Sequence, residues 1–279
     1  MYYIFNKSDI GYSHINSNKP CQDHSAIYKD PNRVIITCCD GHGGPLYVRS
    51  DKGSYYASRA LIDTLSSLNR FNFRKSNVSK LENSIKLSIL CDWNNMVEKD
   101  LSFKHLSNKE CSHLTPDDIS RLKANPIIAY GTTLAGAAIV NNKVVVVNIG
   151  DTEAFVIRKG RLLPVFDTKD DPIANFTYSL CQEDAFNYLR VKVLDLKDVD
   201  GVLLCTDGLT GPYQTYESFE KDFVKPEIYK VAFSHNTNHL NDVIEAIARK
   251  KGSGDDVTLS LVLKDSIKAS HFKERTKLI

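Results

Sequence analysis

The sequence lacks the features that identify several large classes of protein. Its seven cysteines are an odd number and include no Cys-x-x-Cys pair, so neither a disulfide framework nor a zinc site is expected. No stretch approaches the roughly 20 apolar residues that a membrane helix requires. The net charge is only +2, which gives no electrostatic reason to expect a nucleic-acid partner. The N-terminus has no basic flank followed by a long apolar core, so no signal peptide is expected.

These absences leave an ordinary globular protein. The 279 residues contain 42% hydrophobic and 25% charged residues, which is typical of a folded chain of one or two domains. A chain of this length buries a large core without cross-links. We therefore expect a cytoplasmic protein with reduced, mostly buried thiols, without a membrane or nucleic acid among its partners, and acting as a monomer.

Short runs rich in β-branched and aromatic residues predict strands at both ends and in the centre of the chain. Several of these runs are joined by tight turn dipeptides such as Asn141-Asn142 and Lys159-Gly160. Such connections join antiparallel strands, because a parallel crossover needs about a dozen residues or more. The expected strands are 2–6, 25–29, 34–39, 132–140, 143–149, 153–158, 161–165, 188–196, 202–206 and 257–263.

Apolar residues at helical spacing predict amphipathic helices between the groups of strands. Strands in meanders with helices grouped between them favour an α+β fold, in which helices pack on antiparallel sheet faces. The expected helices are about 51–69 and 79–101, a helical stretch over 216–234 that is broken at Pro226, and one around 240–248.

Two segments are expected to lie outside this framework. Residues 102–128 are polar and irregular, and we interpret them as a surface insertion in which Thr115 caps a short helix. Residues 264–279 carry several lysines and little apolar content, which predicts a basic C-terminal tail. No convincing linker divides the rest, so residues 1–263 are expected to form a single domain.

Four acid-bearing turns, each beside or ending an apolar run, are the most informative feature of the chain. Their acids are Asp23, Asp40, Asp207 and Asp255. Converging carboxylates repel one another, and burial raises the cost of ionising them. A bound hard cation removes that cost, and oxygen-only ligand sets suit Mg²⁺ or Mn²⁺. The working hypothesis is therefore a metal-dependent hydrolase.

Six motifs that include these turns occur in the order found in one known family. Chance matches would not keep that order. They resemble the metal-dependent protein phosphatases of the PPM (type 2C) family, closest to the compact bacterial branch, over about residues 9–263. The motifs are Pro20-Cys21-Gln22-Asp23, Cys39-Asp40-Gly41-His42-Gly43-Gly44, Gly131-Thr132-Thr133-Leu134, Asn148-Ile149-Gly150-Asp151-Thr152, Cys205-Thr206-Asp207-Gly208-Leu209 and Gly252-Ser253-Gly254-Asp255-Asp256-Val257-Thr258.

The resemblance implies a four-layer αββα sandwich, with two antiparallel sheets flanked by helices, and two Mn²⁺ or Mg²⁺ ions at one end. Asp40 would bridge the ions, and the Gly41 carbonyl would reach one of them because glycine places no Cβ in the way. Asp207 and Asp255 would complete one coordination sphere, and Asp23 would hold waters on the other ion.

The implied reaction is the hydrolysis of phosphate monoesters on phosphorylated Ser/Thr proteins. A metal-bridged hydroxide would attack directly, without a covalent intermediate. His42 is the expected general acid for the leaving alkoxide, because the histidine pKa lies near working pH. Asp256 is expected to be a hydrogen-bonding neighbour and Asp151 to cap a turn.

Three departures from the family pattern are visible. Ser13-His14, with Lys19 near, stands where the family commonly has a phosphate-binding Arg, so His14 or Lys19 is the expected phosphate clamp. Gln22 stands where Glu is frequent. The segment 127–130 carries no acid for a third ion, so two ions are expected. Two alternatives stay open, namely a phosphatase of small phosphorylated metabolites and a non-catalytic metal- or partner-binding scaffold of the same fold.

Overall fold

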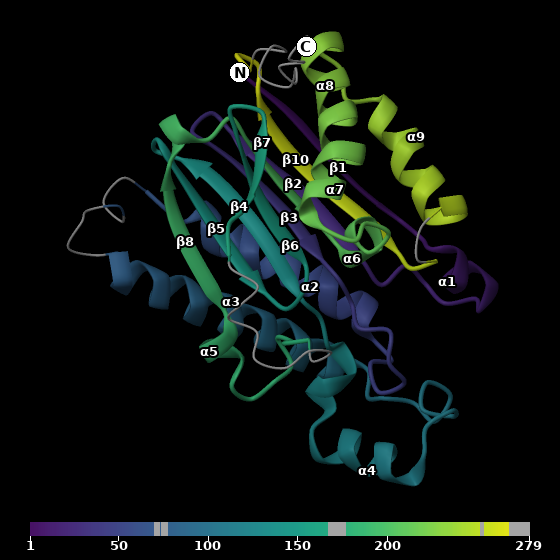
Figure 1. Cartoon of the computed structure of the whole chain (residues 1–279). Helices are drawn as coiled ribbons and strands as arrows, with labels where there is room; N and C mark the ends of the chain where they lie inside the picture. Colours follow the sequence, from purple (N-terminus) through teal and green to yellow (C-terminus); the bar gives the residue numbers. More distant parts are fainter. Residues whose placement is uncertain (70–72, 74–77, 167–176, 252–253, 268–279) are drawn as a thin grey trace.

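Two five-stranded antiparallel sheets pack face to face at the centre of the molecule (Figure 1). The computed structural model describes residues 1–69, 73, 78–166, 177–251 and 254–267. Sheet A consists, in order, of β1 (Tyr2–Asp9), β10 (Val257–Lys264), β9 (Gly201–Cys205), β6 (Glu153–Arg158) and β7 (Arg161–Pro164). Sheet B consists of β2 (His24–Asp30), β3 (Arg33–Cys39), β4 (Leu134–Val140), β5 (Lys143–Ile149) and β8 (Arg190–Asp195).

Alternating side chains of the strands fill the space between the sheets. In β5, Val144 and Val146 belong to the cluster between the sheets, whereas Val145 and Val147 belong to the cluster under the helices. All four are fully buried, so this apolar run is covered on both faces. All seven cysteines are free thiols, and Cys38, Cys39 and Cys205 are completely buried.

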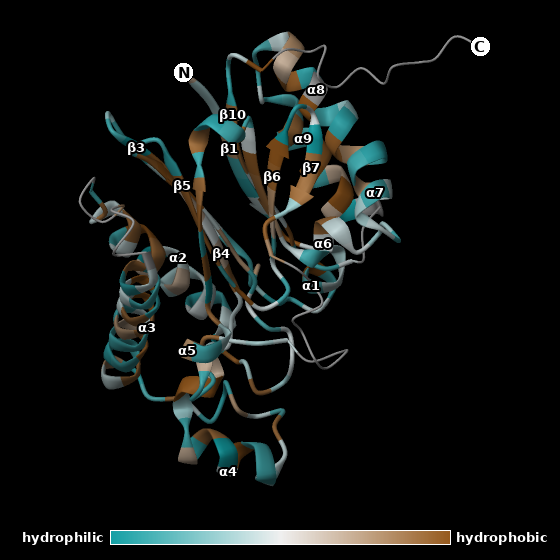
Figure 2. Ribbon diagram, turned by 60° about the vertical axis from the view of Figure 1, so that its left-hand side comes forward, coloured by the Kyte–Doolittle hydropathy of each residue, from teal (hydrophilic) through white to brown (hydrophobic). Residues whose placement is uncertain are grey.

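Helices cover the outer face of each sheet, which makes the four-layer αββα sandwich that the resemblance implied (Figure 2). On sheet B lie α2 (Ser50–Ser66) and α3 (Val78–Phe103). On sheet A lie α6 (Asp207–Thr210), α7 (Tyr216–Phe219), α8 (Lys225–Ser234) and α9 (His239–Ala246). Shorter elements are α1 (Tyr12–Asn16), α4 (Pro116–Ala124), α5 (Ala185–Tyr188), the 3₁₀ turns Pro126–Tyr130 and Leu196–Asp198, and the π turns Glu220–Val224 and Ile247–Lys251. None of the helices among these described residues is long and apolar enough to cross a membrane.

The helix interruption predicted at Pro226 lies earlier in the chain. Pro226 stands in the first turn of α8, directly after a π turn in which the Lys225 N–H donates to the Glu220 carbonyl, so the chain stays helical across the proline. The irregular part is the π turn Glu220–Val224, which joins α7 to α8. The residues on either side of it, Phe219 and Lys225, keep right-handed helical backbone angles. The prediction of a break at the proline itself is therefore wrong.

The segment 102–128 is more ordered than predicted. Its helix α4 begins as expected, with the Thr115 side chain accepting a hydrogen bond from the Asp118 N–H, but Leu114 and Leu122 are buried in the core cluster under α2 and α3. The few apolar residues of this polar segment face the core together. Hydrophobic periodicity over so short a stretch does not reveal this burial. Most of the predicted tail, 268–279, lies outside the described residues.

Candidate metal centre

The four acidic turns lie at one end of the sandwich and come from both sheets. Asp23 directly precedes β2 and Asp40 directly follows β3, while Asp207 follows β9 and Asp255 lies just before β10. Each pair of strands is antiparallel, so the end of one strand lies beside the start of its neighbour. The topology therefore brings together acids that are far apart in the sequence.

The charges of these carboxylates act on one another. Burial, followed by the charges of Asp23 and Asp207, raises the pKa of Asp40 well above its ordinary value. Loss of hydration, together with Asp151 and Asp255, raises the pKa of Asp207 to about 6. Asp23 is 7% exposed, whereas Asp207 and Asp255 are exposed at the surface. The cluster thus runs from a buried end to an open one.

This cluster fits hard divalent cations. Its donors are oxygen atoms, which suit Mg²⁺ and Mn²⁺ rather than softer metals. The raised pKa values of Asp40 and Asp207 show that the ionised cluster is electrostatically uncompensated by the protein alone. Bound cations would supply that compensation.

Hydroxyl groups hold the buried end of the cluster. The Asp23 Oδ2 accepts hydrogen bonds from the Thr206 and Thr258 hydroxyls, at 2.9 and 2.7 Å. The Asp256 carboxylate accepts from the backbone N–H groups of Gly11 and Gln22, at 2.8 and 2.6 Å. Asp256 is therefore the hydrogen-bonding neighbour that was expected. The two threonines stood inside the quoted motifs, but no role was predicted for them.

Two further threonines hold the backbone of Asp40. The Thr132 hydroxyl donates to the Asp40 carbonyl at 2.8 Å, and the Thr133 N–H donates to the same oxygen at 2.8 Å. The Thr133 hydroxyl accepts from the Asp40 N–H at 3.1 Å. These contacts give the central-strand motif a physical purpose, because they fix the carboxylate that is expected to bridge the ions.

Gly41 is required by close packing of the backbone. A Cβ at this position would lie 2.6 Å from the carbonyl oxygens of Gln22 and Ser50. Its N–H donates to the Gln22 carbonyl at 3.1 Å, and Gly41 pairs with Thr132 as an isolated bridge. The glycine thus lets three segments meet beside Asp40, which is a different reason from the freedom of its carbonyl.

His42 lies next to this junction. The centroid of its ring lies 4.8 Å from that of the Tyr47 ring. The backbone N–H of His42 donates to the Gly131 carbonyl at 3.1 Å. Burial lowers the pKa of His42, and the charge of Asp151 opposes that shift. The imidazole is therefore mainly neutral near pH 7. A phosphate dianion beside it would raise the pKa again.

The two predicted phosphate ligands take different positions. His14 Nδ1 lies 3.0 Å from Asp256 Oδ1, and His14 Nε2 lies 3.9 Å from Asp255 Oδ1. Lys19 is exposed, and its Nζ donates to the Gly43 carbonyl at 3.4 Å. The structure thus places His14 against the carboxylates and Lys19 beside the glycine turn that follows His42.

Asp151 belongs to the acidic cluster as well as to a turn. Gly150, with φ +84°, makes the turn, and the Asp151 carboxylate accepts from the Thr177 hydroxyl at 2.7 Å. Its charge also acts on Asp40, His42 and Asp207. The turn role favoured by the sequence is therefore incomplete. An Asp-Gly or Gly-Asp pair is so common in turns that its sequence alone carries no signal for a second role.

Comparison with known proteins identifies the family. The family described as "Protein phosphatase 2C" matches residues 10–245, which make up most of the chain. The chain belongs to the protein phosphatase 2C family. The serine/threonine phosphatase stp of Listeria welshimeri is 26% identical over 152 residues, which cover 47% of this chain and 56% of that protein. The chain therefore matches just over half the length of this relative of the family.

Solved structures share the 2C-type fold. A bacterial serine phosphatase aligns with a TM-score of 0.60 at 18% identity, over 96% of this chain and 98% of that one. Stp1 from Staphylococcus aureus aligns with a TM-score of 0.56 at 18% identity, over 94% and 95%. The catalytic domain of PstP in complex with two manganese ions aligns with a TM-score of 0.52 at 16% identity, over 94% and 97%. At these identities the likeness establishes the fold.

Proposed function

We propose that this chain is a metal-dependent phosphatase that hydrolyses phosphate monoesters on serine and threonine residues of proteins. The observation that carries the proposal is the convergence of Asp23, Asp40, Asp207 and Asp255, where burial and then mutual repulsion raise the pKa of Asp40 and Asp207. A cluster of this kind at the open end of a 2C-type sandwich is suited to cations and to a charged substrate.

Each carboxylate has a part in this proposal. Asp40, Asp207, Asp255 and the Gly41 carbonyl would hold two Mn²⁺ or Mg²⁺ ions, and Asp23, fixed by its two threonines, would orient bound water. Bound cations would supply Lewis-acid polarisation of the phosphate and lower the pKa of the attacking water. The threonine contacts to the Asp40 backbone would keep this ligand in place while the substrate exchanges.

Protons and phosphate oxygens would be handled at the rim. His42 would donate a proton to the leaving alkoxide, since the substrate dianion counteracts the lowering of its pKa by burial. Lys19, which is exposed beside Gly43, would neutralise a phosphate oxygen. His14 stays a candidate for the same task, with its Nδ1 3.0 Å from Asp256 Oδ1.

The relatives support the substrate class and the ions. The Listeria relative is named a serine/threonine phosphatase, and the PstP domain was solved with two manganese ions. We infer a phosphorylated Ser/Thr protein as substrate and two ions of this class as cofactors. We also propose a single catalytic domain over 1–263 that acts as a monomer in the cytoplasm, without a nucleic-acid or membrane partner.

The first experiment measures phosphate release from a phosphothreonine peptide in EDTA, Mg²⁺ and Mn²⁺. The wild type should turn over only with metal, and Asp207→Asn should lose at least about 100-fold in kcat because a ligand is weakened. Asp198→Asn, which changes an exposed acid of the same charge, should behave as wild type. Turnover in EDTA, or equal turnover by Asp207→Asn, would contradict the proposal.

The same assay separates the proposal from the small-metabolite alternative. The phosphopeptide and a panel of small esters, including a sugar phosphate and a nucleotide, are compared by kcat/KM under identical metal. A preference for the small ester of several hundredfold would overturn the protein substrate. Bound Mn²⁺ without turnover on any ester would instead indicate a binding scaffold.

A further inference from the structure

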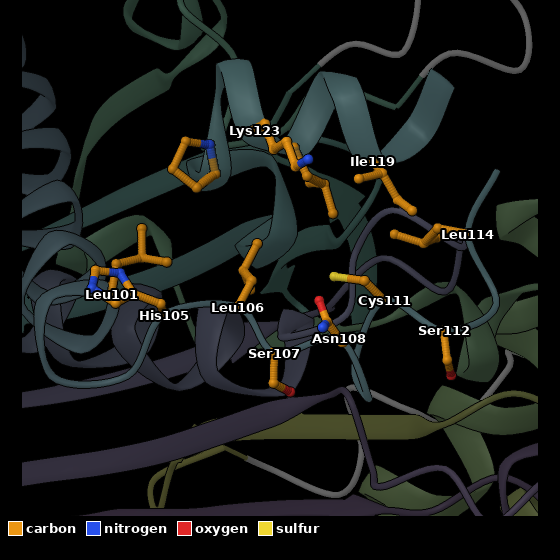
Figure 3. Close-up of a pocket in the computed structure, with 12 residues that line it drawn as sticks. Leu101, His105, Leu106, Ser107, Asn108, Cys111, Ser112, Leu114, Ile119 and Lys123 are labelled. Carbon is orange, nitrogen blue, oxygen red and sulfur yellow. The ribbon is translucent and has the colours of Figure 1, made fainter. Parts of the chain in front are cut away.

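A cavity of about 640 Å³ lies away from the metal centre, between the end of α3 and helix α4 (Figure 3). It is the segment 101–126 itself that forms the walls. This volume falls in the range of sites for small organic ligands, which is about 300–1,000 Å³. None of the residues that line the cavity was assigned to the phosphatase site.

The lining combines an apolar wall with one exposed lysine. Leu122 belongs to the lining. Leu106, Leu114 and Ile119 form much of the rest of the wall, and Cys111 places its thiol among them (Figure 3). The charged side chain that lines the cavity is Lys123, and the described residues provide no ion-pair partner for it. No acidic residue is among the described lining residues. An apolar molecule with one anionic group is therefore the complementary ligand.

The wall of the cavity is tied to a buried arginine. Arg49 is 2% exposed, and its guanidinium donates to the carbonyls of Lys104 and His105, at 2.8 and 3.0 Å. It also donates to Glu110, at 2.8 Å, and to the Tyr130 hydroxyl, at 2.6 Å. Movement of the 104–110 loop away from Arg49 would break several charge-assisted hydrogen bonds, so these bonds hold the loop and Arg49 together.

Arg49 in turn adjoins the loop that follows β3 and contains Asp40, Gly41 and His42, which we call the metal-centre loop. The next residue, Ser50, accepts a hydrogen bond from the Gln22 side chain at 2.6 Å. The Gln22 carbonyl accepts from the Gly41 N–H at 3.1 Å, and the Gln22 amide contacts the His42 carbonyl at 3.4 Å. A continuous set of packed and hydrogen-bonded groups therefore connects the cavity wall with Gly41 and His42.

We propose that this cavity binds a small molecule with an apolar body and one anionic group, and that its occupancy changes the position of the metal-centre loop through Arg49. The cavity would then be a regulatory site. Binding does not depend on the proposed function, whereas the effect on turnover does. The two parts are therefore measured separately.

Binding is measured by calorimetry with decanoate as the probe, below its micelle concentration, against 1-decanol and decyltrimethylammonium. Decanoate should bind with one site per chain, and both other probes should bind at least about tenfold more weakly because they lack the anion. Lys123→Glu and the cavity-filling Asn108→Trp should each weaken the binding of decanoate by about tenfold or more. Lys109→Glu, an exposed lysine of the same segment outside the lining, is the matched control. Equal binding of the three probes, or none, would overturn the site.

Coupling is measured by titrating Mn²⁺ with and without saturating decanoate. The apparent Mn²⁺ affinity should change by about fivefold or more, in either direction, and phosphate release should change with it. Arg49→Gln, or Glu110→Gln if the first variant does not fold, should still bind decanoate but lose the change. An unaltered Mn²⁺ affinity in the wild type would overturn the coupling. A changed affinity without phosphatase activity would uphold it and contradict only the proposed function.

Discussion

At the scale of single residues, the metal centre depends on hydroxyl groups that carry no charge. Asp23 is buried and its pKa is raised by burial and by Asp256, so its ionised form relies on the donors at its Oδ2. Thr206 donates to that oxygen and also accepts from the Thr258 N–H at 3.0 Å. One hydroxyl thus links the end of β9, the start of β10 and the Asp23 turn.

Thr206→Val keeps the shape of the side chain but removes both hydrogen bonds. We expect it to lower the free energy of unfolding by about 1–3 kcal/mol and to raise the half-saturating Mn²⁺ concentration about tenfold. Thr64→Val is the matched control, because the buried Thr64 hydroxyl has no hydrogen-bond partner among the residues that the structure describes, and its loss should be neutral or stabilising. Urea unfolding and Mn²⁺-dependent turnover measure the two effects. Equal behaviour of the two variants would contradict this role of Thr206.

A second prediction at this scale concerns pH. Glu110 accepts from Arg49 and from the Ser107 N–H and hydroxyl, and the Arg49 hydrogen bond comes first among the contacts that lower the pKa of Glu110 from 4.5 to about 2. Because the folded-state pKa is depressed, ionised Glu110 contributes its full stabilisation above pH 4.5. This contribution is lost as pH falls toward 2.

Glu110→Gln should therefore lower the free energy of unfolding by about 1–3 kcal/mol at pH 7, because the buried Arg49 loses a charged partner. The difference between the variant and wild type should shrink as pH falls from 4.5 to 2. Asp63→Asn, which breaks the exposed pair with Arg59 at 3.7 Å, should cost about 0–1 kcal/mol. Urea unfolding at pH 7, 4 and 3 provides the measurement. A difference that grows at low pH would contradict the assignment.

At the scale of elements, helix α2 packs closely on sheet B because Gly136 of β4 has no side chain. A Cβ at Gly136, in the middle of β4, would lie 1.9 Å from the Leu61 side chain of α2. Leu61 is fully buried, so it has little room to move. Since Ser50 at the start of α2 accepts a hydrogen bond from Gln22, the packing of this helix on sheet B also positions the metal-centre loop.

Gly136→Ala should therefore overpack this contact and destabilise the protein by about 1–3 kcal/mol. Leu61→Ala alone should cost about 2–5 kcal/mol through the cavity it leaves. The double variant should cost at least about 1 kcal/mol less than the sum, because the new methyl group fills part of that cavity. A double-mutant cycle by urea unfolding tests this expectation. Additive costs would show that the two positions do not meet.

The elements of this chain were largely predictable because their burial is periodic. Strands β5 and β6 were predicted at their observed bounds, since an apolar run between tight turns leaves little choice of boundary. The role of segment 102–128 was not predicted, because Leu114 and Leu122 belong to a core whose other members come from α2, α3 and the strands of sheet B, which are distant in the sequence. A pattern within one segment carries no information about partners that are distant in sequence.

At the scale of the whole molecule, the same distinction holds for the metal centre. The ordered motifs predicted that Asp23, Asp40, Asp207 and Asp255 converge, because each stands at the end of a strand that a fold can align. The contact of His14 with Asp256 could not be predicted. It depends on how α1 crosses the start of β10, where the Ser13 N–H donates to the Gly254 carbonyl at 2.9 Å.

Because the acids come from both sheets, their repulsion acts across the sandwich. Asp23 and Asp40 flank strands of sheet B, and Asp207 and Asp255 flank strands of sheet A, so we expect their charges to repel one another across the two sheets when no cation is bound. Bound cations would reverse the sign of this contribution. The metal centre is then a structural link between the sheets as well as the place of the proposed reaction.

Replacing one carboxylate should therefore have opposite effects with and without metal. In EDTA, Asp40→Asn should melt at a higher temperature than the wild type, because one half-buried charge and its repulsion by Asp23 and Asp207 are removed. Saturating Mn²⁺ should stabilise the wild type by about 2.7 kcal/mol at 100 times its Kd. The same Mn²⁺ should stabilise Asp40→Asn far less, so the order of melting temperatures should reverse. Thermal unfolding of both proteins in EDTA and in Mn²⁺ is the measurement. A variant that is less stable than the wild type in EDTA would show that Asp40 supports the fold by other contacts and that repulsion across the sheets is minor.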